Sequence, residues 1–140
     1  MSPELILFLD ENHHNNKHLL SLLSARGVRH ERHRDHFTPG LADIEWLPEI
    51  GRRKWALLTT DKRIRYRTIE KQAVLDNDVR MFCFSTNNMS GRDMANALGL
   101  ALDKIKKIFS STPAPFIAMI TKSGNVVVRK DFNETKSIAT

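Results

Sequence analysis

A chain of 140 residues is about the size of one domain and is long enough to bury a hydrophobic core. Hydrophobic residues make up 41% and charged residues 27%, as in soluble globular proteins, and no apolar run approaches the roughly 20 residues that span a membrane. The N-terminus has no secretion signal, and the single cysteine, Cys83, cannot form an internal disulfide. We therefore predict a cytoplasmic protein that does not bind membranes.

Positive charge is concentrated in one part of the chain. The formal net charge is +6 and the isoelectric point is about 9.8, which suits a polyanionic partner because binding to phosphates releases condensed counterions. Between residues 52 and 71 only Asp61 and Glu70 are acidic, whereas the basic residues are Arg52, Arg53, Lys54, Lys62, Arg63, Arg65, Arg67 and Lys71. This segment either binds a nucleic-acid backbone or forms an ordinary solvated surface.

Apolar runs and helical periodicities alternate along the first 84 residues. They predict strands at residues 4–9, 28–33, 55–60 and 79–84, and helices in the segment that ends at Gly27, around 43–53 and at 67–75. Because Pro48 lies within the second helix, that helix is expected to be kinked there or to begin near it. This alternation predicts an α/β fold, in which a mostly parallel sheet carries helices on both faces.

The last part of the chain is predicted to add a C-terminal helix and a β-hairpin. Ser90 suits the N-cap of a helix at 91–109, and strands at 116–121 and 126–129 flank a turn at 123–125. We predict a single domain over residues 1–132: a core with an acidic site at 1–85, the helix and hairpin at 86–132, and then a tail at 133–140.

Two apolar strands each end in a carboxylate, Asp10 and Asp61. Ligands of open α/β sheets bind outside the carboxyl ends of the strands, so these acids meet there if their strands lie close together. Asp43 lies in the segment that precedes the strand ending at Asp61, and Glu11 follows Asp10 directly. Clustered carboxylates repel unless their pKa values shift or they share a cation, and Mg²⁺ or Mn²⁺ suits oxygen ligands. Helix capping or turn formation is the alternative role for any one of these acids.

Four sequence elements, taken in order, resemble the PIN-like nucleases. They are FLDEN at Phe8–Asn12, D-x-x-W at Asp43–Trp46, PEIGRRKW at Pro48–Trp55 and LTTDKRIR at Leu58–Arg65. The resemblance covers Leu5–Phe84 and is closest to the toxin subgroup of bacterial toxin–antitoxin pairs. It implies a PIN-like three-layer sandwich and a metal-dependent ribonuclease that hydrolyses RNA phosphodiesters with Mg²⁺ or Mn²⁺.

The resemblance also implies roles for individual residues. Asp10, Asp43 and Asp61 match the acids of the family motif and are predicted to be catalytic and to bind metal, with Glu11 assisting. Positive side chains beside such a site can hold phosphates, and the predicted RNA-binding residues are Arg53, Lys62, Arg63, Arg65 and Arg67. Related sequences often carry a second acid where this chain has Arg63. Whether the site holds one metal ion or two is therefore left open. The resemblance implies RNA and a protein antitoxin as partners. Whether the protein forms a homodimer is left open.

Other residues near these motifs receive more ordinary interpretations. Solvated or phosphate-facing positions are expected for His13, His14 and His18, and no catalytic role is assigned to His30, His33 and His36. Trp46 fits the core, but could stack on a base if exposed. Thr59 or Thr60 is expected to orient Asp61 or a metal-bound water through its hydroxyl.

Two other functions fit parts of the pattern. Acids after the first strand and Asp61 after a later one also resemble a phospho-accepting receiver domain, which would need a lysine at a late strand end, here Lys122. The basic segment after Asp61 is unlike the apolar loop of a receiver. The second alternative is a catalytically silent nucleic-acid-binding module, whose binding would depend on salt but not on metal.

Overall fold

A six-stranded sheet forms the middle layer of the computed structural model, in which residues 4–13, 15–60, 68–86 and 88–129 are described. The strand order is β2-β1-β3-β4-β5-β6, with the bounds β1 (Ile6–Leu9), β2 (Arg29–Arg32), β3 (Ala56–Thr59), β4 (Arg80–Phe84), β5 (Phe116–Ile120) and β6 (Val126–Val128). The first five are parallel to one another, and β6 pairs antiparallel with β5. Parallel neighbours place their carboxyl ends at the same edge of the sheet.

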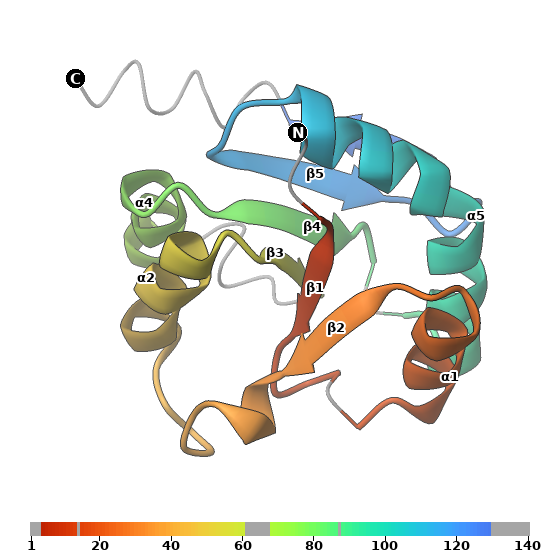
Figure 1. Ribbon diagram of the computed structural model, residues 1–140, viewed down its shortest axis with the longest axis horizontal. Coiled ribbons are helices and arrows are strands. Elements are labelled where there is room, and N and C mark those ends of the chain that lie inside the picture. Colours follow the sequence, from red (N-terminus) through yellow and green to blue (C-terminus); the bar gives the residue numbers. More distant parts are fainter. Residues whose placement is uncertain (1–3, 14, 61–67, 87, 130–140) are drawn as a thin grey trace.

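Helices cover both faces of this sheet (Figure 1). One face carries α1 (Lys17–Ala25) and α5 (Gly91–Ser111), which contact each other, and the opposite face carries α2 (Asp43–Arg53) and α4 (Thr68–Asp76), which also pack together. This arrangement confirms the predicted α/β sandwich with its mostly parallel central sheet.

Strand β1 separates two hydrophobic cores. Leu7 and Leu9 belong to the core under α1 and α5, whereas Phe8 points to the other face and packs with Trp46 and Trp55. All three β1 residues are completely buried. A strand buried on both faces needs apolar residues at every position, which explains the continuous run in the sequence.

Side-chain caps mark the starts of α1 and α5. Asn16 caps α1 by accepting hydrogen bonds from the backbone N–H groups of His18 and Leu19, and Ser90 caps α5 in the same way through the N–H of Asp93. The helix predicted around residues 43–53 is confirmed, because α2 begins at Asp43 and contains Pro48; of the two alternatives for the proline, a helix start near it is excluded.

The C-terminal helix and hairpin continue the sandwich. Strand β5 extends the parallel sheet at the edge of β4, and α5 contributes Leu98 and Ile105 to the same core as Leu7. Gly124, with a φ of +87°, allows the turn before β6, since an added Cβ would lie 2.4 Å from Cβ of Leu100. None of the helices in the described part of the chain is long and apolar enough to cross a membrane.

Candidate active site

Asp10 occupies the carboxyl end of β1, beside the end of β3. Leu9 pairs with Leu58 in register, so the next residues along the two strands, Asp10 and Thr59, continue side by side. The Thr59 hydroxyl donates a hydrogen bond to Oδ2 of Asp10. Asp10 is only 3% exposed and Thr59 is completely buried. A buried carboxylate held by a hydroxyl donor has one well-defined position, as a metal ligand or a general base requires.

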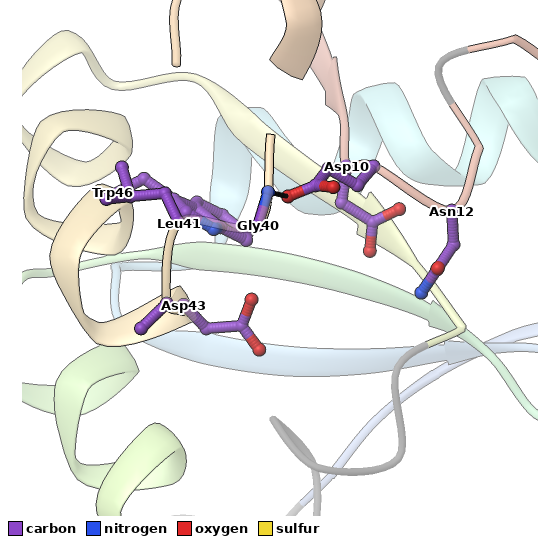
Figure 2. A pocket seen from close by; sticks show the side chains of 8 residues that line it. Asp10, Asn12, Gly40, Leu41, Asp43 and Trp46 are labelled. Carbon is purple, nitrogen blue, oxygen red and sulfur yellow. Dashed lines mark hydrogen bonds between the residues drawn. The ribbon is translucent and has the colours of Figure 1, made fainter. Parts of the chain in front are cut away.

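A pocket of about 230 Å³ opens next to Asp10. The turn after β1 lines one side with Asp10, Glu11 and Asn12, and the opposite side is formed by residues 40–43 and Trp46. Asp43 is the first residue of α2, and in Figure 2 its carboxylate extends toward the space that the side chains of Asp10 and Asn12 also face. Residues 33 positions apart in the sequence thus bring two carboxylates to one pocket.

Glu11 also lines this pocket, but its carboxylate is already engaged. Oε1 accepts a hydrogen bond of 2.8 Å from the backbone N–H of Gly40 (Figure 2). The same oxygen lies 3.5 Å from Nε2 of His33, a residue that is completely buried among Phe8, Phe37 and Trp46.

A second side-chain contact joins the β1 turn to the end of β3. His13 is 5% exposed, and its Nε2 lies 2.8 Å from the hydroxyl oxygen of Thr60. The expectation that His13 is solvated or faces phosphate is therefore wrong, because its side chain is buried, with its ring centroid 6.5 Å from that of Phe84 in a T-shaped arrangement. His18 is exposed as expected, and His14 lies outside the described residues.

Thr59 and Thr60 each contact a side chain of the segment after β1, and the expectation that one of them orients Asp61 stays a prediction. Thr59 orients Asp10, and Thr60 contacts His13, whereas Asp61 lies outside the described residues. Trp46 is 2% exposed and packs against Phe8, so its use as an exposed base-stacking platform is contradicted.

Only one of the five predicted RNA-binding residues belongs to the described part of the chain. Lys62, Arg63, Arg65 and Arg67 lie outside the described residues, whereas Arg53 lies at the end of α2 near the amino end of β3. Its Nε is 2.6 Å from Oε1 of Glu49, and its guanidinium carbon is 4.9 Å from the ring centroid of Trp55. Arg53 is thus at the opposite edge of the sheet from Asp10 and does not line the pocket.

Glu49 titrates below the ordinary range of a carboxyl group because its pKa is lowered by two arginines. Hydrogen bonds from the side chains of Arg52 and then Arg53 lower its pKa from 4.5 to about 2. Because these groups are on the surface, the pairing has little bearing on the pocket and is screened by salt.

The pocket donors fit a hard divalent cation with few protein ligands. Asp10 and Asp43 supply carboxylate oxygens and Asn12 an amide oxygen, and Mg²⁺ is commonly held by one or two carboxylates while its other positions are filled by water and substrate phosphate. Over the described ranges, no three His, Cys, Asp or Glu side chains form a group that could hold a metal ion. A fuller ligand set would therefore need a residue outside these ranges, and Asp61 is the one that the sequence predicts.

Lys122 bears on the receiver-like alternative. It follows β5, whose carboxyl end lies at the same edge as that of β1, but its Nζ is 3.7 Å from Oδ2 of Asp93 at the start of α5. Its side chain is 69% exposed and does not line the acidic pocket.

Fold and pocket together define an α/β sandwich with acidic residues converging outside the carboxyl ends of its parallel strands, the usual ligand position in such sheets. A family model described as a PIN-like domain matches residues 5–86, and the chain belongs to this family. No curated protein and no solved structure matches the chain significantly. Because PIN-like domains are generally nucleases, membership supports a nuclease-type function.

Proposed function

We propose that this protein is a metal-dependent ribonuclease that hydrolyses RNA phosphodiesters and serves as the toxin of a toxin–antitoxin pair. The observation that carries the catalytic part is the shared pocket of Asp10 and Asp43 at the carboxyl edge of a PIN-like sheet. The basic composition favours a polyanionic substrate, while RNA as the substrate and the toxin role rest on the resemblance in the sequence motifs.

Asp10 and Asp43, joined by Asp61 from the sequence, would hold Mg²⁺ or Mn²⁺. Such an ion polarises a phosphodiester, lowers the pKa of water and offsets charge on the leaving oxygen. Thr59 fixes Asp10 through its hydroxyl hydrogen bond, so that the carboxylate need not reorganise when the substrate arrives. The Asn12 amide lines the same pocket and can donate a hydrogen bond to a phosphate oxygen.

Substrate binding would use the basic segment after β3. Lys62, Arg63, Arg65 and Arg67 follow Asp61 in the sequence, and guanidinium groups can contact phosphate oxygens through paired N–H donors. A protein antitoxin would then act by blocking access to this substrate surface or to the pocket.

The test compares cleavage of labelled single-stranded RNA and of DNA with the same sequence, in Mg²⁺, in Mn²⁺ and in excess chelator. We expect metal-dependent cleavage of RNA, and a loss of at least about 100-fold in Asp10→Asn and Asp61→Asn. Asp103→Asn is the matched control, because Asp103 is an exposed carboxylate of α5 that does not line the pocket. Full activity in Asp10→Asn, or equal cleavage in chelator, would overturn the metal-dependent mechanism.

The same preparation separates the two alternatives. A receiver-like domain would gain a phosphoryl group on Asp61 during incubation with acetyl phosphate, whereas the nuclease would not. A silent nucleic-acid-binding module would bind RNA with a steep salt dependence, unaffected by metal, and would leave the RNA intact.

A further inference from the structure

The carboxylate of Glu11 has two partners in the described part of the chain. Its Oε1 accepts the 2.8 Å hydrogen bond from Gly40 and also faces His33 at 3.5 Å. Hydrogen bonds to an ionised carboxylate are stronger than bonds between neutral groups. A cation bound to the same oxygen would have to compete with both partners.

His33 gives this contact a rigid support. It is completely buried, with its ring centroid 5.4 Å from that of Phe37 and 5.8 Å from that of Trp46. Tight packing leaves an aromatic ring of this kind little freedom to move. The position of Glu11 is therefore bounded by a fixed imidazole on one side and by the Gly40 backbone on the other.

The segment that Glu11 holds leads directly to Asp43. Gly40 has a φ of +82°, a conformation that favours glycine, and the N–H of Leu41 closes a turn by donating to the carbonyl of Thr38 at 3.2 Å. Residues 40–42 then line the pocket up to Asp43, where α2 begins. Only two residues separate the Gly40 anchor from Asp43, so displacement of this turn would move the start of the helix.

We propose that Glu11 is a positioning residue, which clasps the Gly40 turn and thereby sets the place of Asp43 opposite Asp10, and that it does not bind the cation itself. This assignment rests on the proposed metal-dependent function and changes the role expected for Glu11 from the sequence. Residues that orient metal ligands in this way commonly change metal affinity or activity by about 10- to 100-fold when they are removed.

The variants Glu11→Gln and Glu11→Ala distinguish a residue that holds the Gly40 turn from a residue that binds the cation. The glutamine amide oxygen can still accept the Gly40 hydrogen bond, whereas alanine cannot. We expect Glu11→Gln to bind Mn²⁺ within about threefold of the wild type, and Glu11→Ala to bind about 10- to 100-fold more weakly. Glu45→Gln and Glu45→Ala are matched controls, because Glu45 is an exposed acid in the first turn of α2 outside the pocket. Equal weakening in both Glu11 variants would show that Glu11 binds the cation and would overturn the clasp.

A readout without metal tests the clasp separately. Amide hydrogen exchange at Gly40 should accelerate at least about tenfold in Glu11→Ala but stay near the wild-type rate in Glu11→Gln, and the Asp43 amide resonance should shift only in Glu11→Ala. Unchanged Gly40 exchange and an unmoved Asp43 resonance in a folded Glu11→Ala would overturn the proposal. If the wild type binds no Mn²⁺, the proposed function fails, and these amide measurements alone decide the clasp.

Discussion

The two edges of the parallel sheet carry charged groups in contrasting ways. At the carboxyl edge, Asp10 is 3% exposed and is held by the completely buried Thr59, opposite Asp43 across a pocket. At the amino end of β3, Glu49 pairs with Arg52 and Arg53 on the surface. One edge thus holds acids beside a pocket, and the other pairs an acid with exposed arginines.

This difference shows that strand direction, more than nearness in the sequence, decides which residues share a site. Arg53 lies ten positions from Asp43 in the sequence, but α2 places them at its two ends and therefore at opposite edges of the sheet. Asp10 is much farther away in the sequence, yet it meets Asp43 because β1 ends where α2 begins. Substitutions at the two edges should therefore have very different effects on function.

The largest effect is expected from Asp43→Asn at the carboxyl edge. The amide keeps the shape of the side chain but removes the negative charge, so we expect the cleavage rate to fall by about 100-fold and Mn²⁺ binding to weaken. Cleavage kinetics and a Mn²⁺ titration measure these changes, and circular dichroism checks the fold. Wild-type kinetics in this variant would remove Asp43 from the site and leave Asp10 without its partner across the pocket.

Local sequence patterns predicted the part of this edge that depends on strand endings. The run before Asp10 is apolar at every position because β1 is buried on both faces, and its abrupt end marks the carboxyl edge. The place of Asp43 could be predicted for a similar reason, since it starts the helix that leads into β3. These features depend on short segments, whose periodicity and boundaries are written in the sequence.

Pairing between distant side chains could not be obtained in that way. Thr59 bonds Asp10 because β1 and β3 are neighbours in a particular register, and register is a property of the whole sheet. His33 lies in the polar segment RHERHRDH, in which no residue signals a buried position, yet Phe8, Phe37 and Trp46 enclose it. The aromatic residues that bury it come from three different segments, so only the folded arrangement reveals their convergence.

Thr59→Val sharpens the comparison at a residue with an intermediate expected effect. Valine has a similar shape but cannot donate the hydrogen bond to Asp10, so we expect unfolding to become easier by about 1–3 kcal/mol and cleavage to slow by about tenfold. Thr59→Ser retains the hydroxyl and should recover most of the cleavage rate. Urea denaturation and cleavage kinetics measure the two effects. Equal rates in the valine and serine variants would mean that the hydroxyl does not position Asp10.

The smallest effect is expected at the amino end of β3, from Glu49→Gln. The side-chain hydrogen bonds from Arg52 and Arg53 lower the pKa of Glu49 from 4.5 to about 2. A pKa that is lower in the folded state contributes stability above the unfolded value, and this contribution is lost as the pH falls from about 4.5 through about 2. The exposed position and screening by salt keep it small.

We therefore expect the wild type to exceed Glu49→Gln slightly in stability near neutral pH, and the difference to shrink as the pH falls toward 2 or as salt is added. Urea denaturation over a pH series measures the difference, and cleavage assays at neutral pH should give the same rate for both proteins. A large loss of cleavage would contradict the separation of the two edges, since it would couple this surface ion pair to the pocket. A gain of RNA affinity with a steeper salt dependence would instead return Arg53 to the substrate-binding surface, because the guanidinium released from Glu49 would then contact phosphate.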